Sequence, residues 1–187
     1  MFGVVWGQLK KKFSKSKYLE RIISGTEQGA SHMADGYARV TGKPGVVVCD
    51  SDTSATNTIT GLQTANMDSA PLVVFVCHFT EDKELTNIFE QIDHIGISRS
   101  CTKHNFLVTK ISELPRIIRE ALHLSITGRP GTILVDISRE VLQDKDNFKF
   151  PSIERISGYK VPKLAPKKDI NKANMFFPYQ NKYDFGS

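Results

Sequence analysis

The sequence predicts an α/β fold, with a parallel sheet flanked by helices on both faces. Its apolar runs at 46–49, 72–77 and 132–137 show no alternation with polar residues, as expected of strands that are buried on both faces. Segments with a helical apolar period separate these runs, and strands joined in this way require right-handed crossovers and parallel pairing. With 187 residues, of which 40% are hydrophobic, the chain is long enough for one such domain and a short extension.

The first part of the chain is expected to form a strand, a connection and a helix. Phe2 to Val5 is a short apolar stretch suited to a buried strand, and residues 8–24 are a lysine-rich connection whose pattern indicates neither helix nor strand. A helix is predicted from about Glu27 to Val40, with Thr26 as its N-cap and Gly42 at its end.

The middle of the chain continues the alternation. A second helix is predicted from about Ser54 to Met67, before the strand at 72–77. Residues 78–105 are polar and irregular, and a short strand follows at 106–108. Ser112 is expected to cap a strongly amphipathic helix, which leads into the last buried strand.

The composition changes after Val141 to Lys, Asp, Asn and Pro, without a sustained helical or strand period. We therefore predict one domain over residues 1–143. Residues 144–187 are expected to be a linker and tail, forming the start of a middle domain.

The chain is basic, with a net charge of +5, but its lysines crowd near the two ends of the sequence. Basic clusters can attract phosphate backbones. Here they lack interleaved aromatic residues and any recognisable nucleic-acid module. We expect no nucleic-acid partner.

The cysteines and the apolar runs indicate the cellular compartment of the protein. Cys49, Cys77 and Cys101 are odd in number and far apart, which favours reduced thiols. The longest apolar run falls well short of the ~20 residues that a membrane helix needs. The apolar start precedes its lysines, unlike a signal peptide. We expect a cytoplasmic protein with no membrane partner.

The expected topology of the sheet locates a candidate site. Ligands of parallel α/β sheets bind beyond the carboxyl ends of the strands, which points to the segments after Cys49 and Cys77 and the segment before Glu27. Of the histidines His78, His94 and His104, the first two have no ligand partner at useful spacing, and His104 lies within one of the sequence blocks described next, so no metal site is predicted.

Several sequence blocks resemble the large subunit of the acetolactate (acetohydroxyacid) synthases, in order and in spacing, across roughly residues 25–141. The blocks are Glu27-Gln28-Gly29-Ala30, Ala34 to Gly45, Ala55 to Leu62, Met67-Asp68-Ser69-Ala70-Pro71, Cys101 to Asn105, Gly128 to Gly131 and Leu134 to Ile137. Together they identify the chain as similar to the N-terminal, pyrimidine-binding domain of that thiamine diphosphate-dependent family.

The resemblance implies a site and a reaction. In the family, the glutamate matching Glu27 hydrogen-bonds N1′ of the aminopyrimidine and promotes loss of the thiazolium proton, as the catalytic residue. Thr56 and Asn57 are implied to bind the cofactor with it, and Gly7, Phe89 and Glu90 to lie near the substrate. The implied reaction condenses pyruvate with a second 2-oxo acid in branched-chain amino acid biosynthesis. From the residues alone, Glu27 could simply favour the helix dipole in a first turn.

The departures from the family pattern fall near this site. Ser51-Asp52-Thr53-Ser54 stands where the family has a loop with two glycines and a proline, and Asp52 adds a negative charge there. Phe89-Glu90-Gln91 reverses the amide and the acid of the family's Phe-Gln-Glu, and Cys77-His78-Phe79 replaces Gly-Gln-Val. Thr26 stands for a histidine.

Cofactors and partners follow from the resemblance. Thiamine diphosphate is implied, bound here by its pyrimidine end only. Mg²⁺ and FAD are implied through domains that we expect to be absent from this chain. A homo-oligomer, or a complementing chain with the diphosphate domain, is expected, with a regulatory small subunit as a further partner. The plastid stroma is the alternative location. The alternative function is a truncated, inactive remnant or a partner-binding module.

Overall fold

The computed structural model describes most of the chain, in residues 2–5, 20–49, 52–78, 92–147, 156–162 and 164–176. The chain divides into two compact units, Met1–Ile156 and Ser157–Ser187. The predicted division at residue 143 stays a prediction. Within these described ranges no helix is long and apolar enough to cross a membrane.

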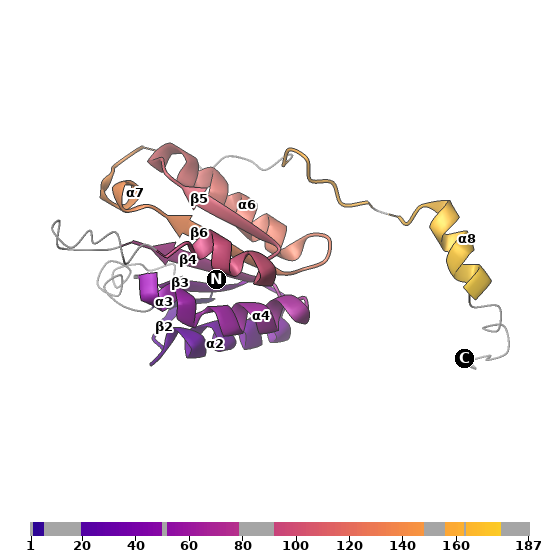
Figure 1. The fold of residues 1–187 in the computed structure, drawn as a ribbon, viewed down its shortest axis with the longest axis horizontal. Coiled ribbons are helices and arrows are strands. Elements are labelled where there is room, and N and C mark those ends of the chain that lie inside the picture. The colour runs from indigo at the N-terminus through magenta and orange to yellow at the C-terminus, as the bar shows by residue number, and fades with distance from the viewer. Residues whose placement is uncertain are drawn as a thin grey trace. The chain divides into compact units, whose positions relative to one another are not determined.

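The first unit contains one sheet of six strands, all parallel, which confirms the predicted fold class. The spatial order is β2-β1-β3-β4-β6-β5 (Figure 1). The strands are β1 Phe2–Val5, β2 Glu20–Ile22, β3 Gly45–Cys49, β4 Leu72–Cys77, β5 His104–Val108 and β6 Thr132–Ile137.

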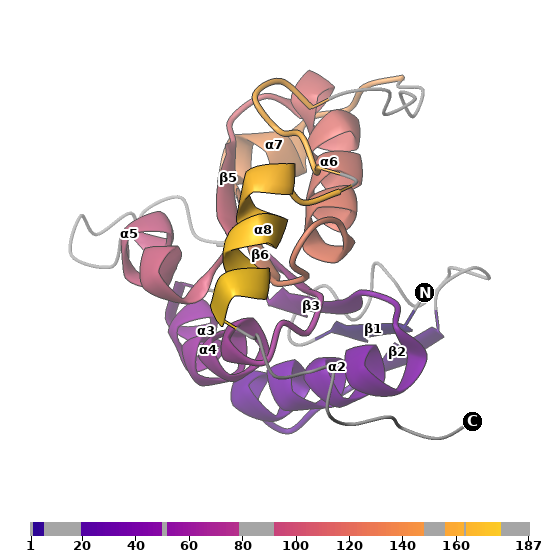
Figure 2. The ribbon, with the colours of Figure 1, turned by 90° about the vertical axis from the view of Figure 1, so that its right-hand side faces the viewer.

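The central strands are buried on both faces, as their apolar runs predict. Val47, Val74 and Leu134 are in register across three neighbouring strands and belong to one core cluster with the helices α2 (Glu27–Thr41) and α4 (Ile59–Met67). Residues of opposite parity, such as Val73 and Val135, face the other way and are also fully buried. The helix α6 (Leu114–Ile126) packs against β4, β5 and β6 and lies on the opposite side of the sheet from α2 and α4 (Figures 1 and 2).

Helix α2 begins and ends as predicted. The Thr26 hydroxyl accepts a hydrogen bond from the backbone N–H of Gly29 at 3.0 Å. Gly42 ends the helix with φ +66°, a left-handed conformation that glycine adopts without steric cost, and its N–H donates to the Ala38 carbonyl.

The predicted helix at 54–67 is two helices, α3 (Asp52–Asn57) and α4. They are separated at Thr58, whose hydroxyl donates to the Ala55 carbonyl at 2.6 Å. The apolar period does not register this break, because a one-residue turn displaces the apolar face only slightly. The N-cap prediction at Ser112 is wrong, since a 3₁₀ turn at Ile111–Glu113 precedes α6 and makes Glu113 the residue before the helix.

Four short elements were absent from the prediction. β2 lies within the lysine-rich connection, and α5 (His94–Ser98) and the 3₁₀ turn Arg99–Cys101 lie within the predicted irregular segment. α7 (Arg139–Gln143) follows β6 directly. None of these is long enough to show a period.

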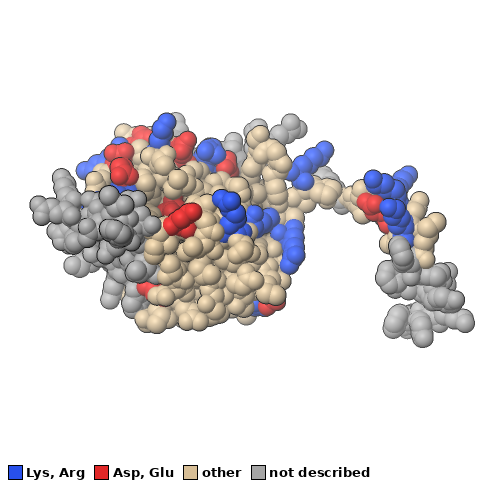
Figure 3. All heavy atoms as spheres, in the orientation of Figure 1, with Lys and Arg blue, Asp and Glu red and all other residues tan. Residues whose placement is uncertain are grey.

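The second unit contains a helix where a tail without regular structure was predicted. This helix, α8, spans Lys167–Phe176, and its described side chains are exposed. Lysines gather on it (Figure 3). A helix whose side chains are exposed needs no apolar stripe, so the apolar pattern of the sequence did not predict α8.

Three of the family-like blocks meet at the amino edge of the sheet. Arg39 pairs with Asp35 on its own helix and with Asp68 after α4, at 2.9 and 2.7 Å, and both partners raise the pKa of the guanidinium. Arg129 donates to the Ser69 hydroxyl and to the Met67 carbonyl. These blocks therefore hold together the turns that precede β3, β4 and β6.

The block Cys101 to Asn105 also has a structural role. The ammonium group of Lys103 donates to the carbonyls of Leu124 and Thr127 at 2.5 and 2.6 Å, which satisfies the C-terminal end of α6. The Thr132 hydroxyl donates to the Cys101 carbonyl at 2.7 Å. This block joins the start of β6 to the helix that precedes it.

Two helix glycines give a direct test of this packing. A Cβ at Gly61 of α4 would overlap the Ser31 side chain of α2, whereas a Cβ at Gly36 of α2 would meet nothing within 4 Å. We expect Gly61→Ala to lower the free energy of unfolding by about 1–3 kcal/mol, because the helices must separate. Gly36→Ala should raise it by about 0.5–1 kcal/mol, because alanine favours the helix.

The measurement is urea unfolding of the two variants and the wild-type chain, followed by circular dichroism. Gly36→Ala is the matched control for the alanine substitution itself. Equal shifts of the two variants in the same direction would contradict the close approach of α2 and α4.

Candidate functional site

The sheet order defines where a ligand can approach. β1 lies between β2 and β3 in the sheet. The strand that follows β1 in sequence, β2, therefore pairs on one side of it, and the next strand, β3, pairs on its other side. Such a reversal point, at the carboxyl ends of the strands, is the usual ligand site of parallel α/β sheets. The segments that follow β2 and β3 therefore meet at the predicted site.

Glu27 and Asn57 are brought together at this edge. Glu27 is the first residue of α2, shortly after β2, and only 6% of it is exposed. Asn57 ends α3, which follows β3, and its side-chain amide donates to Oε2 of Glu27 at 3.1 Å. Glu27 lies in the first turn of the 15-residue helix α2. The structure thus places a buried, oriented carboxyl group where the sequence predicts one.

The other predicted site residues are placed only in part. Thr56 is half-buried on α3, next to Asn57 in sequence. Gly7, Phe89 and Glu90 lie outside the described residues. The departure at residues 51–54 falls partly in α3, because Asp52 is the first residue of that helix.

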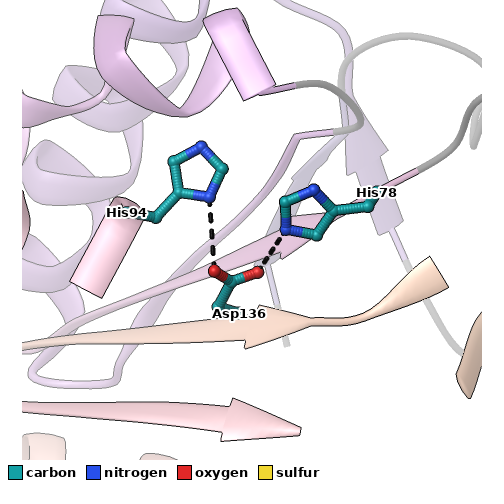
Figure 4. Close-up of side chains that lie close together, drawn as sticks. All are labelled: His78, His94 and Asp136. Atoms are coloured by element: carbon teal, nitrogen blue, oxygen red, sulfur yellow. Dashed lines mark hydrogen bonds and ion pairs between the residues drawn. The ribbon is translucent and has the colours of Figure 1, made fainter. Parts of the chain in front are cut away.

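A second polar cluster lies at the carboxyl ends of β4 and β6. His78 follows β4, Asp136 is the penultimate residue of β6, and His94 begins α5. Nε2 of His78 lies 2.5 Å from Oδ1 of Asp136, and Nδ1 of His94 lies 3.3 Å from Oδ2 (Figure 4). The two imidazole rings are 5.1 Å apart, centre to centre.

Asp136 is held ionised by the two histidines. Burial by itself raises the pKa of this carboxyl, but the hydrogen bonds from His78 and His94 outweigh that effect and lower the pKa of Asp136 to about 2. Asp136 occupies a strand in which all six residues are buried. A charged residue at such a position requires partners, and this is the signal in the sequence that could have revealed the cluster.

The comparisons with known proteins agree with the fold. Residues 1–97 match the family model described as thiamine pyrophosphate enzyme, N-terminal TPP binding domain. An acetolactate synthase of Mycobacterium bovis is 40% identical over 176 residues, which cover 92% of this chain and 28% of that protein.

Two further relatives show the same pattern. The acetolactate synthase catalytic subunit, mitochondrial, of Aspergillus candidus is 44% identical over 75% of this chain and 21% of that protein. The acetolactate synthase large subunit of Buchnera aphidicola subsp. Schizaphis graminum is 42% identical over 83% of this chain and 28% of that protein.

The chain spans about a quarter of the length of these relatives. The match to the family model extends over about half of the chain, and it includes Glu27 and Asn57. The parallel sheet has the fold expected of such a domain. This chain therefore belongs to the family described as thiamine pyrophosphate enzyme, N-terminal TPP binding domain, and is similar to part of the acetolactate synthases.

Proposed function

We propose that the edge formed by Glu27 and Asn57 binds the aminopyrimidine end of thiamine diphosphate, and that the chain serves as the pyrimidine domain of an acetolactate synthase. The reaction would join pyruvate to a second 2-oxo acid. The hydrogen bond between Asn57 and the buried carboxyl of Glu27 is the observation that carries this proposal. Identities of 40% or more to acetolactate synthases support the choice of reaction.

The residues present fit an aminopyrimidine. A carboxyl group with little water around it forms stronger hydrogen bonds than one in solvent, and Glu27 is almost fully buried. Its Oε2 is already fixed by Asn57, so the carboxyl group needs little reorganisation to meet a ring nitrogen.

Thiamine diphosphate, when bound, supplies the electron sink for decarboxylation of a 2-oxo acid. Glu27 would hold a proton at N1′ of the pyrimidine and so control proton transfer at the reacting end. Asn57 would keep the carboxyl group in one rotamer, and Thr56 would line the same edge. Gly7, Phe89 and Glu90 are proposed to lie near the substrate.

Further partners belong to the same proposal. The Gly-Asp-Gly motif that binds the diphosphate through Mg²⁺ in the family does not occur in these 187 residues. We propose that a complementing chain with a diphosphate domain completes the site, together with Mg²⁺; a homo-oligomer is the alternative assembly. FAD and a regulatory small subunit are proposed through the same family relationship. The Buchnera relative is named a large subunit.

The first test is calorimetric titration with thiamine diphosphate and Mg²⁺, with and without the separately purified diphosphate domain of an acetolactate synthase. We expect saturable binding when that domain is present. Glu27→Gln should weaken binding by about tenfold or more, since it removes a charge-assisted hydrogen bond.

Glu113→Gln is the matched control, because Glu113 lies at the N-terminal end of a helix, as Glu27 does, but outside the proposed site. It should bind like the wild-type chain. If no binding occurs with either preparation, the inactive remnant or partner-binding module becomes the better description.

The second test concerns Asn57. We expect Asn57→Ala to weaken cofactor binding by a few-fold to tenfold, because one hydrogen bond contributes about 1 kcal/mol. Asn57→Asp should weaken it further, because two carboxylates would then face each other. The midpoint of urea unfolding should fall modestly in both variants, because each removes a hydrogen bond to the buried Glu27 carboxyl.

Asn66→Ala and Asn66→Asp are the controls, since Asn66 lies near the end of α4, toward the amino edge of the sheet, beside Gly131. Both should leave cofactor binding unchanged. Equal binding by Asn57→Asp and the wild-type chain would show that Asn57 does not position Glu27.

A further inference from the structure

The cluster of His78, His94 and Asp136 has the donor atoms of a transition-metal site. It offers two imidazole nitrogens and one carboxylate oxygen, and one such atom from each residue lies within 4.8 Å of the other two. Ligands of a zinc ion, bound at about 2.0–2.2 Å in a tetrahedral arrangement, lie roughly 3.3 Å apart. The distance from Nδ1 of His94 to Oδ2 of Asp136, 3.3 Å, matches that spacing, whereas the 2.5 Å hydrogen bond from Nε2 of His78 to Oδ1 must lengthen to admit an ion.

The three side chains of the cluster differ in their exposure to solvent. The side chain of His94 is fully buried and that of Asp136 is 9% exposed, so both are fixed by the surrounding core. The side chain of His78 is 25% exposed, which gives an ion access from solvent. Three protein ligands with one position open to water is an arrangement that zinc adopts readily.

The charge of the cluster also favours a cation. Asp136 is an acidic residue of a strand whose six residues are all buried, and a metal ion binds such a group as the carboxylate. Among the residues that the structure describes, only the two imidazoles, and no lysine or arginine, lie within ion-pair distance of it. A divalent ion would compensate this buried charge and take the place of the protons that lie between the ring nitrogens and the carboxylate.

The donor set separates this cluster from the Mg²⁺ of the proposed cofactor site. Mg²⁺ prefers six oxygen ligands, whereas two imidazoles with one carboxylate suit zinc and its neighbours in the first transition row. The cluster is also built from different elements than the pair Glu27 and Asn57. An ion here is therefore independent of the proposed function.

We propose that His78, His94 and Asp136 bind a divalent transition-metal ion, with Zn²⁺ as the ion of best fit. His94 and Asp136 form the buried half of the site, and His78 closes it from the solvent side. Water occupies the remaining coordination position. The ion joins the ends of β4 and β6 to the start of α5.

The test is calorimetric titration of the full chain with ZnCl₂, after dialysis against a chelator and in a buffer with a competing weak chelator. The key variant is His78→Gln. Glutamine can still hydrogen-bond to Asp136, so the fold is retained, but an amide is a poor ligand for zinc. The control is His104→Gln, since His104 is an exposed histidine on β5 that contacts Phe106 edge-on.

We expect one Zn²⁺ per chain for the wild-type protein and for His104→Gln, with a rise in melting temperature on addition of ZnCl₂. In His78→Gln the affinity should fall by more than about tenfold, since loss of an outer-shell partner alone typically costs that much. Asp136→Asn should show the same loss. Cobalt substitution should give the visible absorption of a tetrahedral ion in the wild-type chain and in His104→Gln, and not in the other two variants.

Two results would overturn the proposal. One is the absence of a saturable one-to-one site in the wild-type chain, and the other is equal zinc affinity in His78→Gln. Should the variants unfold, nuclear magnetic resonance of the wild-type imidazoles decides the question. Zinc must shift the ring signals of His78 and His94 and leave those of His104 in place, and any other pattern contradicts the site.

Discussion

Every strand of the sheet runs in the same direction, and the position of each functional group depends on this constraint. Parallel pairing puts all carboxyl ends at one edge, so the residues after β2, β3, β4 and β6 gather there from distant parts of the sequence. Glu27 meets Asn57 across 30 residues, and His78 meets Asp136 across 58. Both clusters therefore follow from the strand order.

Residues at the amino edge of the sheet support the fold, whereas those at the carboxyl edge form the proposed site. At the amino edge, Arg39 and Arg129 tie family-like blocks to one another, so these blocks secure the turns before the central strands. At the carboxyl edge lie Asp52 in α3 and His78 after β4, where the sequence predicts departures from the family pattern. The family resemblance thus rests in part on residues that support the sheet, while the proposed chemistry depends on the opposite edge.

The sequence predicted the parts of this structure that local pattern controls. The strands 72–77 and 132–137 were predicted at their observed bounds, because a continuous apolar run marks a doubly buried strand. The break at Thr58 was missed because helical period is insensitive to a single turn. His94 could not be placed beside Asp136, because their contact depends on how β5, β6 and α5 pack across 42 residues. The pairing of Asn57 with Glu27 was predicted only as a shared site, through family likeness.

Within the described part of the chain, the strand that leads to Glu27 has one neighbour. β2 is three residues long, lies at the edge of the sheet formed by the described strands and pairs there with β1. An edge strand this short opens at a lower free energy than the centre of a sheet, so its amide hydrogens exchange through local fluctuations and not through global unfolding. Any ligand held by Glu27 would oppose that opening and slow the exchange. The carboxyl group of Glu27 thus lies next to an edge strand, β2, whose local opening a bound ligand would reduce.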